Sequence, residues 1–538
     1  MYRVPCIKLK NKNRLKHLFF ITYYVLSEEK GMDIKMGEVK KLKYLVNGQW
    51  KESMTDKYSD AYDPSTGEVI AQVPCCTPAE VEEAVEAAKA AFPSWSSTPV
   101  IKRVQVLYKL RDLLIEHMDE LTMLVAKENG KSWEEAQGDV LKAKEGTEQA
   151  ISAPSLMMGE SLMDASAGFD TVLYRMPLGV FAGIVPFNFP AMIPMGWMAP
   201  MCIACGNTIV LKAASFTPQS CMRIAELYKE AGLPDGVINI VTCSRKEAEI
   251  LLTHPDIKGI SFVGSTSVGM HIYSTAAATG KRVQALCEAK NHALVLNDAP
   301  VKRVAAGIIN SSFGCAGERC MALPVVVVQE GIADALVAEI IAQAKTLKVG
   351  PAYDKSTKLG PVVNKAHRES IVKWIETGIE EGAELVLDGR DIVVEGYENG
   401  FYLGPTIFDH VTPDMSIGEK EIFGPVLCIK RVKTFEEGLE IMNANPYANG
   451  SVIFTQSGHY AREFARHTDG GMIGINVGIP VPVGMFPFNG KKLSFIGDLH
   501  CLGKDGYRFF TENKVVTSRW FDEETGESTN VNTWDGTI

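Results

Sequence analysis

The chain has 538 residues, of which 46% are hydrophobic and 22% are charged, a composition that is typical of globular proteins and excludes global disorder. Its 55 Lys and Arg residues against 65 Asp and Glu residues give a formal net charge of −10, which argues against a nucleic-acid-binding protein. Twelve cysteines are too few for a disulfide scaffold, so we expect a reducing compartment in which a thiol can stay free to react.

The N-terminal segment is basic. Its first 27 residues hold six Lys and Arg residues and no acidic residue, and they include a short apolar run at 18–26. No small-residue cleavage site follows, so a secretory signal is not expected. Two interpretations stay open: a mitochondrial presequence, or an upstream start codon that precedes the real start at Met32 or Met36. We expect a cytoplasmic protein, with the mitochondrial matrix as the alternative, and globular patterning begins near Tyr44.

Helical and strand-like patterns alternate from there on. Residues 77–80, Thr-Pro-Ala-Glu, have the form of a capping box with Pro at the first helical position. The charge-free stretch 176–211 is interrupted by prolines and glycines, so we expect no membrane-spanning helix there. It predicts a buried strand, a turn, a helix and a second strand at 208–211.

Later strand-like runs, separated by helical stretches such as 331–345, predict an α/β protein; the runs lie at 259–263, 293–296 and 324–328. Residues 525–538 have the polar composition of a frayed tail. Cys202-x-x-Cys205 has no second cysteine pair or histidine pair at metal spacing. We interpret it as a buried pair of small hydrophobic residues and predict no metal site.

Residues 260–269 read as a strand, a glycine turn at Gly264 and a helix that begins near Ser265. Such a turn points backbone N–H groups at an anion, as dinucleotide sites require, although an ordinary strand-to-helix turn has the same pattern. Lys212, at the end of the 208–211 strand, adds a cation where a cofactor ribose or phosphate could lie. Alone it is equally consistent with a solvated lysine.

Two cysteines, Cys315 and Cys320, are candidates for a reactive thiol. A catalytic thiol needs a lowered pKa and an accessible loop or helix start, and Gly317 and Arg319 fit such an environment. The alternative is a pair of buried packing cysteines. Asn188, in an uncharged Pro-Phe-Asn-Phe-Pro turn, is either a buried carboxamide that satisfies local backbone or a donor to a developing oxyanion.

Together these elements resemble the aldehyde dehydrogenase superfamily over residues 44–520. Four motifs carry the resemblance in the family's order: Pro186-Phe-Asn-Phe-Pro190, Phe262-Val-Gly-Ser-Thr266, Gly317-Glu-Arg-Cys320 and Glu421-Ile-Phe-Gly-Pro425. Further segments are similar to the CoA-acylating methylmalonate/malonate-semialdehyde dehydrogenase branch: Ser155-Leu-Met-Met-Gly-Glu-Ser161, Ala289-Lys-Asn-His292, Gly317-Glu-Arg-Cys-Met-Ala322 and Pro482-Val-Gly-Met485.

The resemblance implies a three-part α/β subunit. A Rossmann-type NAD-binding domain is expected at 41–153 and 178–288, and an α/β catalytic domain at 289–490. A small β extension at 154–177 and 505–520 is expected to mediate oligomers. An N-terminal extension (1–40) and a tail (521–538) complete the chain.

It also implies roles for individual residues. Cys320 is the expected nucleophile, and Asn188 with the Cys320 N–H is expected to stabilise the oxyanion. The expected NAD-binding residues are Phe187, Lys212, Ser215, Gly264, Ser265, Cys287, Glu421 and Phe423. Since Ser215 stands where many relatives have an acidic residue, the usual sign of NAD over NADP is absent, and the preference for NAD follows from the branch. Arg319 and Lys142 are expected to bind a substrate carboxylate.

The resemblance favours transfer of the acyl group to coenzyme A, because hydrolytic relatives carry a glutamate base where this chain has Leu286. Glu288, two residues along, is interpreted as a structural residue, with a role as substitute base left open. A hydrolytic aldehyde dehydrogenase and a non-catalytic structural protein on the same scaffold are the alternatives. The expected partners are a small aldehyde, CoA and further copies of the chain in a dimer or tetramer, with no nucleic acid and no membrane. Valine, β-alanine and inositol breakdown are all compatible pathways.

Overall fold

The computed structural model describes residues 39–166 and 168–519. The predictions about the N-terminal extension and the tail from residue 520 lie outside the described residues. Of the described residues, 41–166 and 168–519 belong to one compact unit. Among the described helices, none is long and apolar enough to cross a membrane.

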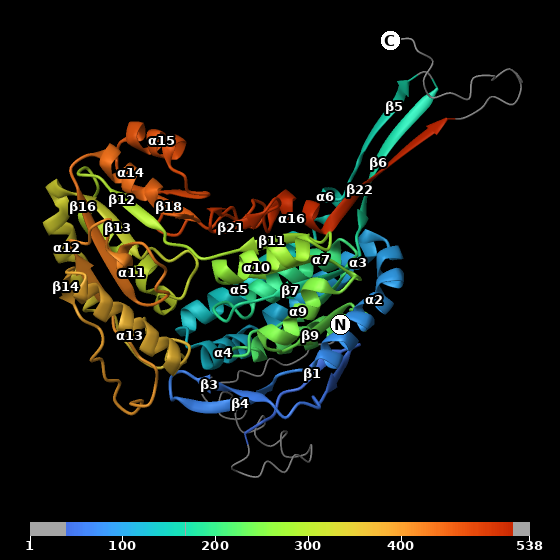
Figure 1. The fold of residues 1–538 in the computed structure, drawn as a ribbon, viewed down its shortest axis with the longest axis horizontal. Coiled ribbons are helices and arrows are strands. Elements are labelled where there is room, and N and C mark those ends of the chain that lie inside the picture. The colour runs from blue at the N-terminus through green and yellow to red at the C-terminus, as the bar shows by residue number, and fades with distance from the viewer. Residues whose placement is uncertain (1–38, 167, 520–538) are drawn as a thin grey trace, which may run out of the picture. The chain divides into compact units, whose positions relative to one another are not determined.

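An eight-stranded sheet forms the centre of the unit (Figure 1). In spatial order its strands are β2 (Gln49–Lys51), β1 (Tyr44–Val46), β9 (Ile238–Val241), β8 (Thr208–Lys212), β7 (Val180–Ile184), β10 (Ile257–Val263), β11 (Arg282–Leu286) and β21 (Phe495–Gly497). The five strands from β9 to β11 run parallel. The chain builds outward from β7 through β8 and β9, then returns to the other side of β7 as β10 and β11. Ligands of open parallel sheets bind at such a switch point, outside the carboxyl ends of the strands.

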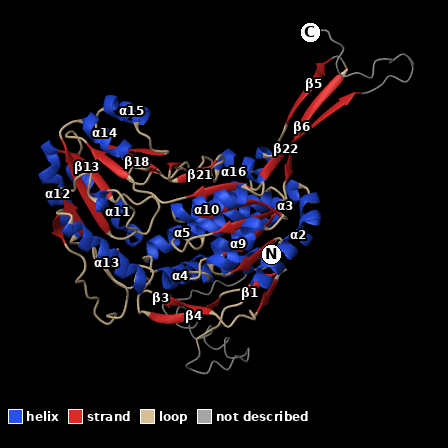
Figure 2. Cartoon of the chain, viewed as in Figure 1, coloured by secondary structure: helices blue, strands red, loops and turns tan. Residues whose placement is uncertain are grey.

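Helices cover both faces of this sheet, as Figure 2 shows. One face packs against α3 (Val100–Glu116), α5 (Trp133–Ala150), α7 (Ala199–Ala204) and α8 (Gln219–Glu230). The other packs against α2 (Pro78–Ser97), α9 (Arg245–Thr253) and α10 (Thr266–Ala277). Alternate residues of β8 divide between the two cores, with Ile209 and Leu211 on one side and Val210 on the other. The near-continuous apolar runs of these strands therefore reflect burial on both faces.

A second, seven-stranded sheet is parallel except at β14. Its order is β14 (Glu384–Leu387), β15 (Thr406–Asp409), β16 (Val426–Val432), β13 (Val325–Gln329), β12 (His292–Val295), β18 (Gly450–Phe454) and β19 (Met472–Ile475). Helices α11 (Val301–Phe313) and α12 (Glu330–Ala344) cover one face. Helices α13 (Lys365–Glu380), α14 (Phe435–Ala444) and α15 (Gly458–His467) cover the other.

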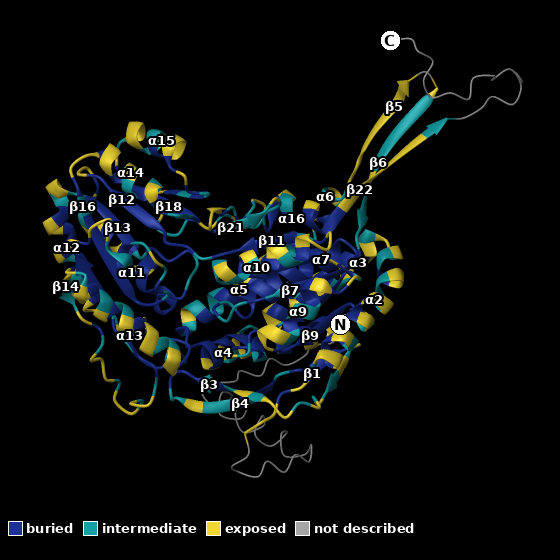
Figure 3. Cartoon of the chain, in the orientation of Figure 1, coloured by how far each residue is buried: buried dark blue, intermediate teal, exposed yellow. Residues whose placement is uncertain are grey.

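A three-stranded antiparallel sheet consists of β22 (Thr511–Arg519), β6 (Phe169–Pro177) and β5 (Glu160–Ser166). Every residue of β5 is exposed, and Figure 3 shows this strand in yellow. The remaining elements are β3 (Tyr58–Asp63), β4 (Glu68–Pro74), α4 (Met118–Asn129), α6 (Ala153–Leu156), π-helix η1 (Ile193–Met198), 3-10 helices η2 (Gly314–Gly317) and η3 (Ser416–Gly418), β17 (Tyr447–Ala448), β20 (Lys491–Lys492) and α16 (Gly503–Phe510).

The predicted elements are confirmed to within one or two residues. Thr77 and Glu80 form the expected capping box at the start of α2. The 176–211 stretch folds as β7, then η1 and α7, then β8. Cys202 and Cys205 are both free and buried. The predicted domain boundaries stay a prediction; apart from β21, each of the three larger sheets lies within one of the proposed parts.

Candidate active site

The predicted site residues gather where the two large sheets face each other. Phe187 and Asn188 follow the carboxyl end of β7, and Gly264 and Ser265 follow that of β10. From the seven-stranded sheet come segments that lie just before strands: Asn291 before β12, Cys320 before β13, Phe423 before β16 and Asn449 before β18. The site therefore joins the carboxyl edge of one sheet to the amino edge of the other.

A cavity of about 580 Å³ opens at this junction, and Cys320 lies in its wall. Arg319, Lys142 and Cys315 also line it, together with apolar surface from Phe189 and Trp197. The cavity has the size and the mostly apolar lining of a small-molecule site. It brings together both candidate thiols and both residues expected to bind a substrate carboxylate.

The loop that carries Cys320 has an unusual backbone. Cys315 and Ala316 have positive φ angles of 50° and 53°, and Gly317 has a φ of 74°. A Cβ atom on Gly317 would lie 2.1 Å from the carbonyl oxygen of Gly424, so only glycine fits. Backbone strain of this kind concentrates at functional sites. This contact brings two of the sequence motifs together in space. Gly317 belongs to the motif that ends at Cys320, and Gly424 belongs to the motif that begins at Glu421.

Three carboxamides hold the main chain around the nucleophile. Asn291 Nδ2 and Asn449 Nδ2 donate to the carbonyl oxygen of Cys320 at 2.9 and 3.1 Å. Asn188 Nδ2 donates to the carbonyl oxygen of Glu318 at 3.0 Å. The amide nitrogen of Asn188 has a second N–H to offer, since a carboxamide carries two donors. Asn188 thus satisfies a backbone carbonyl that is distant in the sequence rather than local, and its role as a donor to an oxyanion stays a prediction.

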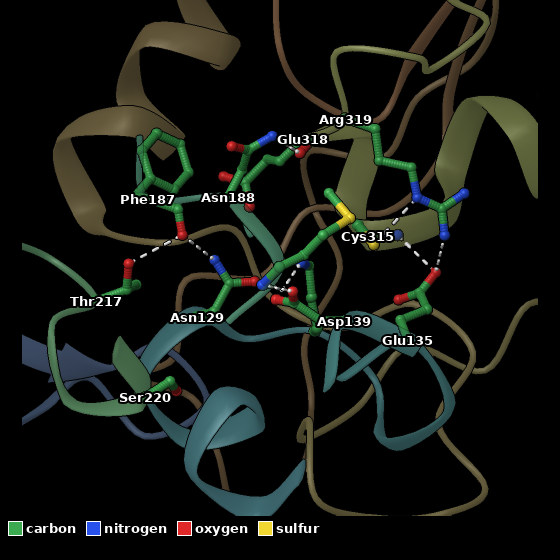
Figure 4. A network of polar contacts seen from close by, with 12 residues as sticks. Asn129, Glu135, Asp139, Phe187, Asn188, Thr217, Ser220, Cys315, Glu318 and Arg319 are labelled. Carbon is green, nitrogen blue, oxygen red and sulfur yellow. Dashed lines mark hydrogen bonds and ion pairs between the residues drawn. The ribbon is translucent and has the colours of Figure 1, made fainter. Parts of the chain in front are cut away.

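Arg319 is anchored by Cys315 and Glu135, as Figure 4 shows. Its Nε donates to Cys315 Sγ at 3.1 Å, and its Nη2 lies 3.1 Å from Glu135 Oε1. The same carboxylate oxygen accepts the Cys315 N–H at 2.6 Å. Glu135 therefore ties helix α5 to both ends of the nucleophile loop.

This arrangement corrects the expected environment of the two thiols. Arg319 was expected to stabilise the thiolate of Cys320, but its hydrogen bond goes to Cys315 because the left-handed turn folds that residue back toward the guanidinium. Burial, with a smaller contribution from the charge of Glu421, raises the pKa of Cys320 to about 12. Burial also raises the pKa of Cys315, to about 11, against the opposing effect of Arg319. A pKa raised this far keeps the Cys320 thiol protonated at neutral pH.

Aromatic rings and a carboxylate surround the expected nicotinamide position. The Phe187 ring packs edge-on against Phe423, with centroids 5.9 Å apart. Phe423 has a φ of 59°, and His367 Nε2 lies 2.8 Å from its carbonyl oxygen. Glu421 Oε1 accepts the N–H of Ala289 at 3.1 Å. Burial, assisted by the charge of Glu288, raises the pKa of Glu421 to about 8.

The expected adenosine side of the cleft lies at the carboxyl end of β8. Lys212 ends this strand, and Ser215 lies in the loop that follows it. Burial lowers the pKa of Lys212. Its ammonium makes no hydrogen bond or ion pair with any residue that the structure describes. Cys287 is different, since its side chain is buried against Gly269 of α10, so only its main chain could reach a cofactor.

Lys142 and Leu286 complete the predicted set. Lys142, on α5, lies in the cavity wall and forms an ion pair of 2.6 Å with Glu145. Leu286 ends β11 and is 4% exposed. Glu288 accepts the backbone N–H of Thr266 at 3.0 Å and so faces the start of α10. This contact agrees with the interpretation of Glu288 as a structural residue.

Sequence reasoning missed Glu135 and Asn449. Glu135 lies in a polar helical stretch where no local pattern distinguishes it from its neighbours. Its partners lie about 180 positions away along the chain. No local signal marks Asn449. Asn291 could have been found, because it lies within the Ala289-Lys-Asn-His292 segment that supports the resemblance.

A model of the aldehyde dehydrogenase family matches residues 50–516, and the chain belongs to this family. It is an oxidoreductase of the aldehyde dehydrogenase class, with the fold of that class. Malonate-semialdehyde dehydrogenase 2 of Geobacillus kaustophilus (strain HTA426) is 52% identical over 483 residues, which cover 90% of this chain and 99% of the relative.

Two solved structures are similar over the same extent. One, from Sinorhizobium meliloti 1021, is described as a methylmalonate-semialdehyde dehydrogenase complexed with NAD. The other is the methylmalonate-semialdehyde dehydrogenase of Oceanimonas doudoroffii. Each has a TM-score of 0.89 and 42% identity, and each match covers 90% of this chain and 99% of the other.

Proposed function

We propose that this chain oxidises a short, carboxylated aldehyde with NAD and transfers the acyl group from Cys320 to coenzyme A. Malonate semialdehyde and methylmalonate semialdehyde are the proposed substrates. The observation that carries the proposal is the position of Cys320, in the wall of a 580 Å³ cavity that also holds Arg319 and Lys142. The names of the relatives support the same substrate class.

The residues of the cleft fit a dinucleotide. Lys212 has an ammonium without a partner among the described residues, at the carboxyl end of a parallel strand. The second carboxylate oxygen of Glu421 has no hydrogen-bond partner among the described residues. It is therefore free to accept a hydrogen bond from the ribose hydroxyls of a cofactor. A Cβ on Gly264 would lie 2.6 Å from the Phe262 ring, so the glycine keeps this turn bare. When bound, NAD supplies the acceptor for the hydride that the substrate carbon loses.

The chain's own residues account for the remaining chemistry. The Cys320 thiol releases its proton to solvent, and its sulfur attacks the aldehyde carbon to form the oxyanion of a hemithioacetal. Asn188 and the Cys320 N–H are proposed to stabilise the oxyanion, since donors fixed before the reaction lower the barrier most. After oxidation Cys320 holds the acyl group as a thioester. The thiol of CoA then exchanges with the Cys320 sulfur, so no net oxidation occurs in this second step.

Selection of CoA over water is proposed to follow from Leu286. A leucine cannot accept a proton from water, so the thioester is hydrolysed slowly. Hydrolysis would need a carboxylate close to the thioester, and Glu288 is instead bound to the start of α10. A thiol needs less activation than water and therefore wins the competition.

Recognition of the substrate carboxylate is proposed to rest on Arg319 and Lys142. Both are already paired, with Glu135 and Glu145. The Lys142 pair is about half exposed, so exchanging Glu145 for a substrate carboxylate costs little. Arg319 keeps its orientation through its hydrogen bonds with Glu135 and Cys315.

The experiment is an aldehyde panel assayed with and without CoA, with NADH absorbance as the readout and mass spectrometry of the product. The proposal expects the carboxylated semialdehydes to give acyl-CoA with a higher kcat/KM than neutral aldehydes of equal size. Preference for neutral aliphatic aldehydes would overturn the substrate assignment, and free acid in the presence of CoA would overturn the CoA assignment.

We further propose that the chain forms a homo-oligomer, dimer or tetramer, through the three-stranded sheet. Leu162 and Met163 of β5 and Val515 of β22 are 63%, 79% and 61% exposed, an apolar surface that association would bury. The cytoplasm stays the proposed compartment. Light scattering at several concentrations tests the oligomeric state.

A further inference from the structure

Glu288 lies beside the N-terminus of α10. Its Oε2 accepts the N–H of Thr266, the first residue of α10. Ser265, at the N-cap position, makes no capping hydrogen bond with its side chain. Glu288 therefore acts as the cap of α10 and brings a full negative charge to the positive end of the helix dipole.

The same helix end is the proposed position of the cofactor diphosphate. Backbone N–H groups at a helix N-terminus attract phosphates, and a carboxylate that already binds one of them competes directly. Glu288 is partly exposed, so its charge remains in the cleft rather than being lost in the core. The helix end thus offers a cofactor fewer free donors and a repelling charge.

Glu288 also faces the proposed nicotinamide side of the cleft. Its charge contributes to the raised pKa of Glu421, after burial, and to that of Tyr447. Glu288 and Glu421 are therefore close enough to interact electrostatically. Glu288 accepts the N–H of Thr266, and Glu421 accepts the N–H of Ala289. A bound dinucleotide would extend past both carboxylates.

The charge of the cofactor changes during the reaction. The nicotinamide ring is a cation before it accepts the hydride and neutral afterwards, while the diphosphate stays anionic. A negative charge on Glu288 therefore repels the reduced form more strongly than the oxidised form.

We propose that Glu288 is a specificity-determining residue that weakens binding of the reduced cofactor more than that of the oxidised cofactor. It does so by competing for the N-terminus of α10 and by placing a negative charge close to Glu421 in the proposed cofactor cleft. This inference rests on the proposed function, because it assumes that NAD binds between α10 and Glu421.

The test compares Glu288→Gln with the wild type in equilibrium binding. Gln keeps an oxygen that can accept from Thr266, so the cap is retained while the charge is removed. NADH affinity is measured by its fluorescence, NAD+ affinity by competition, and NADH dissociation by stopped flow. We expect Glu288→Gln to bind NADH about two- to fivefold more tightly, the range of a charge at a helix end, with a smaller gain for NAD+ and slower release of NADH.

Glu249→Gln is the matched control. Glu249, on α9, pairs at 2.6 Å with His271, a residue of α10 that lies away from the N-terminus of that helix. This variant should leave both affinities unchanged. Equal or weaker NADH binding by Glu288→Gln, or an equal gain for NAD+, would overturn the inference. Thermal unfolding of both variants checks that the fold is kept, and Glu288→Ala provides a second uncharged side chain. If the wild type bound neither form of the cofactor, the proposed function itself would fail, whereas unchanged affinities in an enzyme that binds NADH would reject only the role of Glu288.

Discussion

Two thiols lie five positions apart in one loop and share one cavity wall, and their contacts separate their roles. Cys315 accepts a hydrogen bond from Arg319, and its backbone N–H is bound by Glu135. Cys320 has its carbonyl fixed by Asn291 and Asn449, and its sulfur makes no hydrogen bond with another side chain among the residues that the structure describes. Cys315 is therefore part of the support of the loop, and Cys320 is free to react.

Exchanging each thiol for a methyl group tests this division. Cys320→Ala should abolish aldehyde-dependent NADH production, because the nucleophile is lost. Cys315→Ala should retain most of the rate, since Glu135 still holds Arg319. Steady-state kinetics with both variants decides the matter, and substantial turnover by Cys320→Ala would reject the assignment of the nucleophile.

The raised pKa of Cys320 predicts a pH dependence of its reactivity. Alkylation needs the thiolate, and a pKa of about 12 leaves the thiol protonated through the neutral range. Without cofactor, the rate of Cys320 alkylation by iodoacetamide should rise about tenfold per pH unit from about pH 7 to about pH 10, without a plateau. Peptide mass spectrometry distinguishes Cys320 from Cys315. A plateau below about pH 8 would indicate a lowered pKa and contradict the structure.

Lys142 offers a test of carboxylate recognition. Lys142→Gln should raise KM for malonate semialdehyde by about two- to fivefold, the range of an exposed charge pair, and should leave KM for a neutral aldehyde unchanged. Lys144→Gln is the control, since Lys144 pairs with Glu148 on the same helix and does not line the cavity. An equal rise for both substrates would mean that Lys142 is a solvated helix residue.

At the scale of elements, the loop of η2 depends on a glycine. Gly317 combines a positive φ with direct contact to the main chain of Gly424. Gly317→Ala should therefore shift the nucleophile loop, destabilise the fold by about 2 kcal/mol and lower kcat steeply. Chemical denaturation and kinetics measure the two effects. Gly458→Ala, where a Cβ meets open space, should change neither, and a fully active Gly317→Ala would show that the loop tolerates the displacement.

The elements themselves could largely be predicted from the sequence, because their signals are local. The capping box of α2 and the apolar run of β7 and β8 each lie within a few dozen residues. The contact of Glu135 with Cys315 could not be predicted, since it joins distant parts of the chain. The partner of Arg319 also depends on the left-handed backbone of Cys315 and Ala316. Neither cysteine nor alanine favours this conformation, so the sequence does not predict it.

At the scale of the whole described unit, each of the two large sheets contributes one side of the candidate site. The carboxyl edge of the eight-stranded sheet provides Asn188 and the proposed cofactor cleft, and the amino edge of the seven-stranded sheet provides Cys320 and Glu421. The hydrogen bond from Asn188 to the carbonyl of Glu318 connects the two edges beside the nucleophile. The proposed chemistry at Cys320 therefore requires that both sheets keep their relative positions, since the proposed site lies at their junction.

The central claim, that the acyl group on Cys320 passes to CoA rather than to water, is tested most directly by a single-turnover experiment. Enzyme in excess is mixed with malonate semialdehyde and NAD, with and without CoA, and the products and the Cys320 adduct are followed by mass spectrometry. We expect acyl-CoA when CoA is present, and a slowly decaying acyl adduct on Cys320 when it is absent. Fast release of free acid without CoA, lost in Glu288→Gln, would contradict this account and would identify Glu288 as the base that activates water.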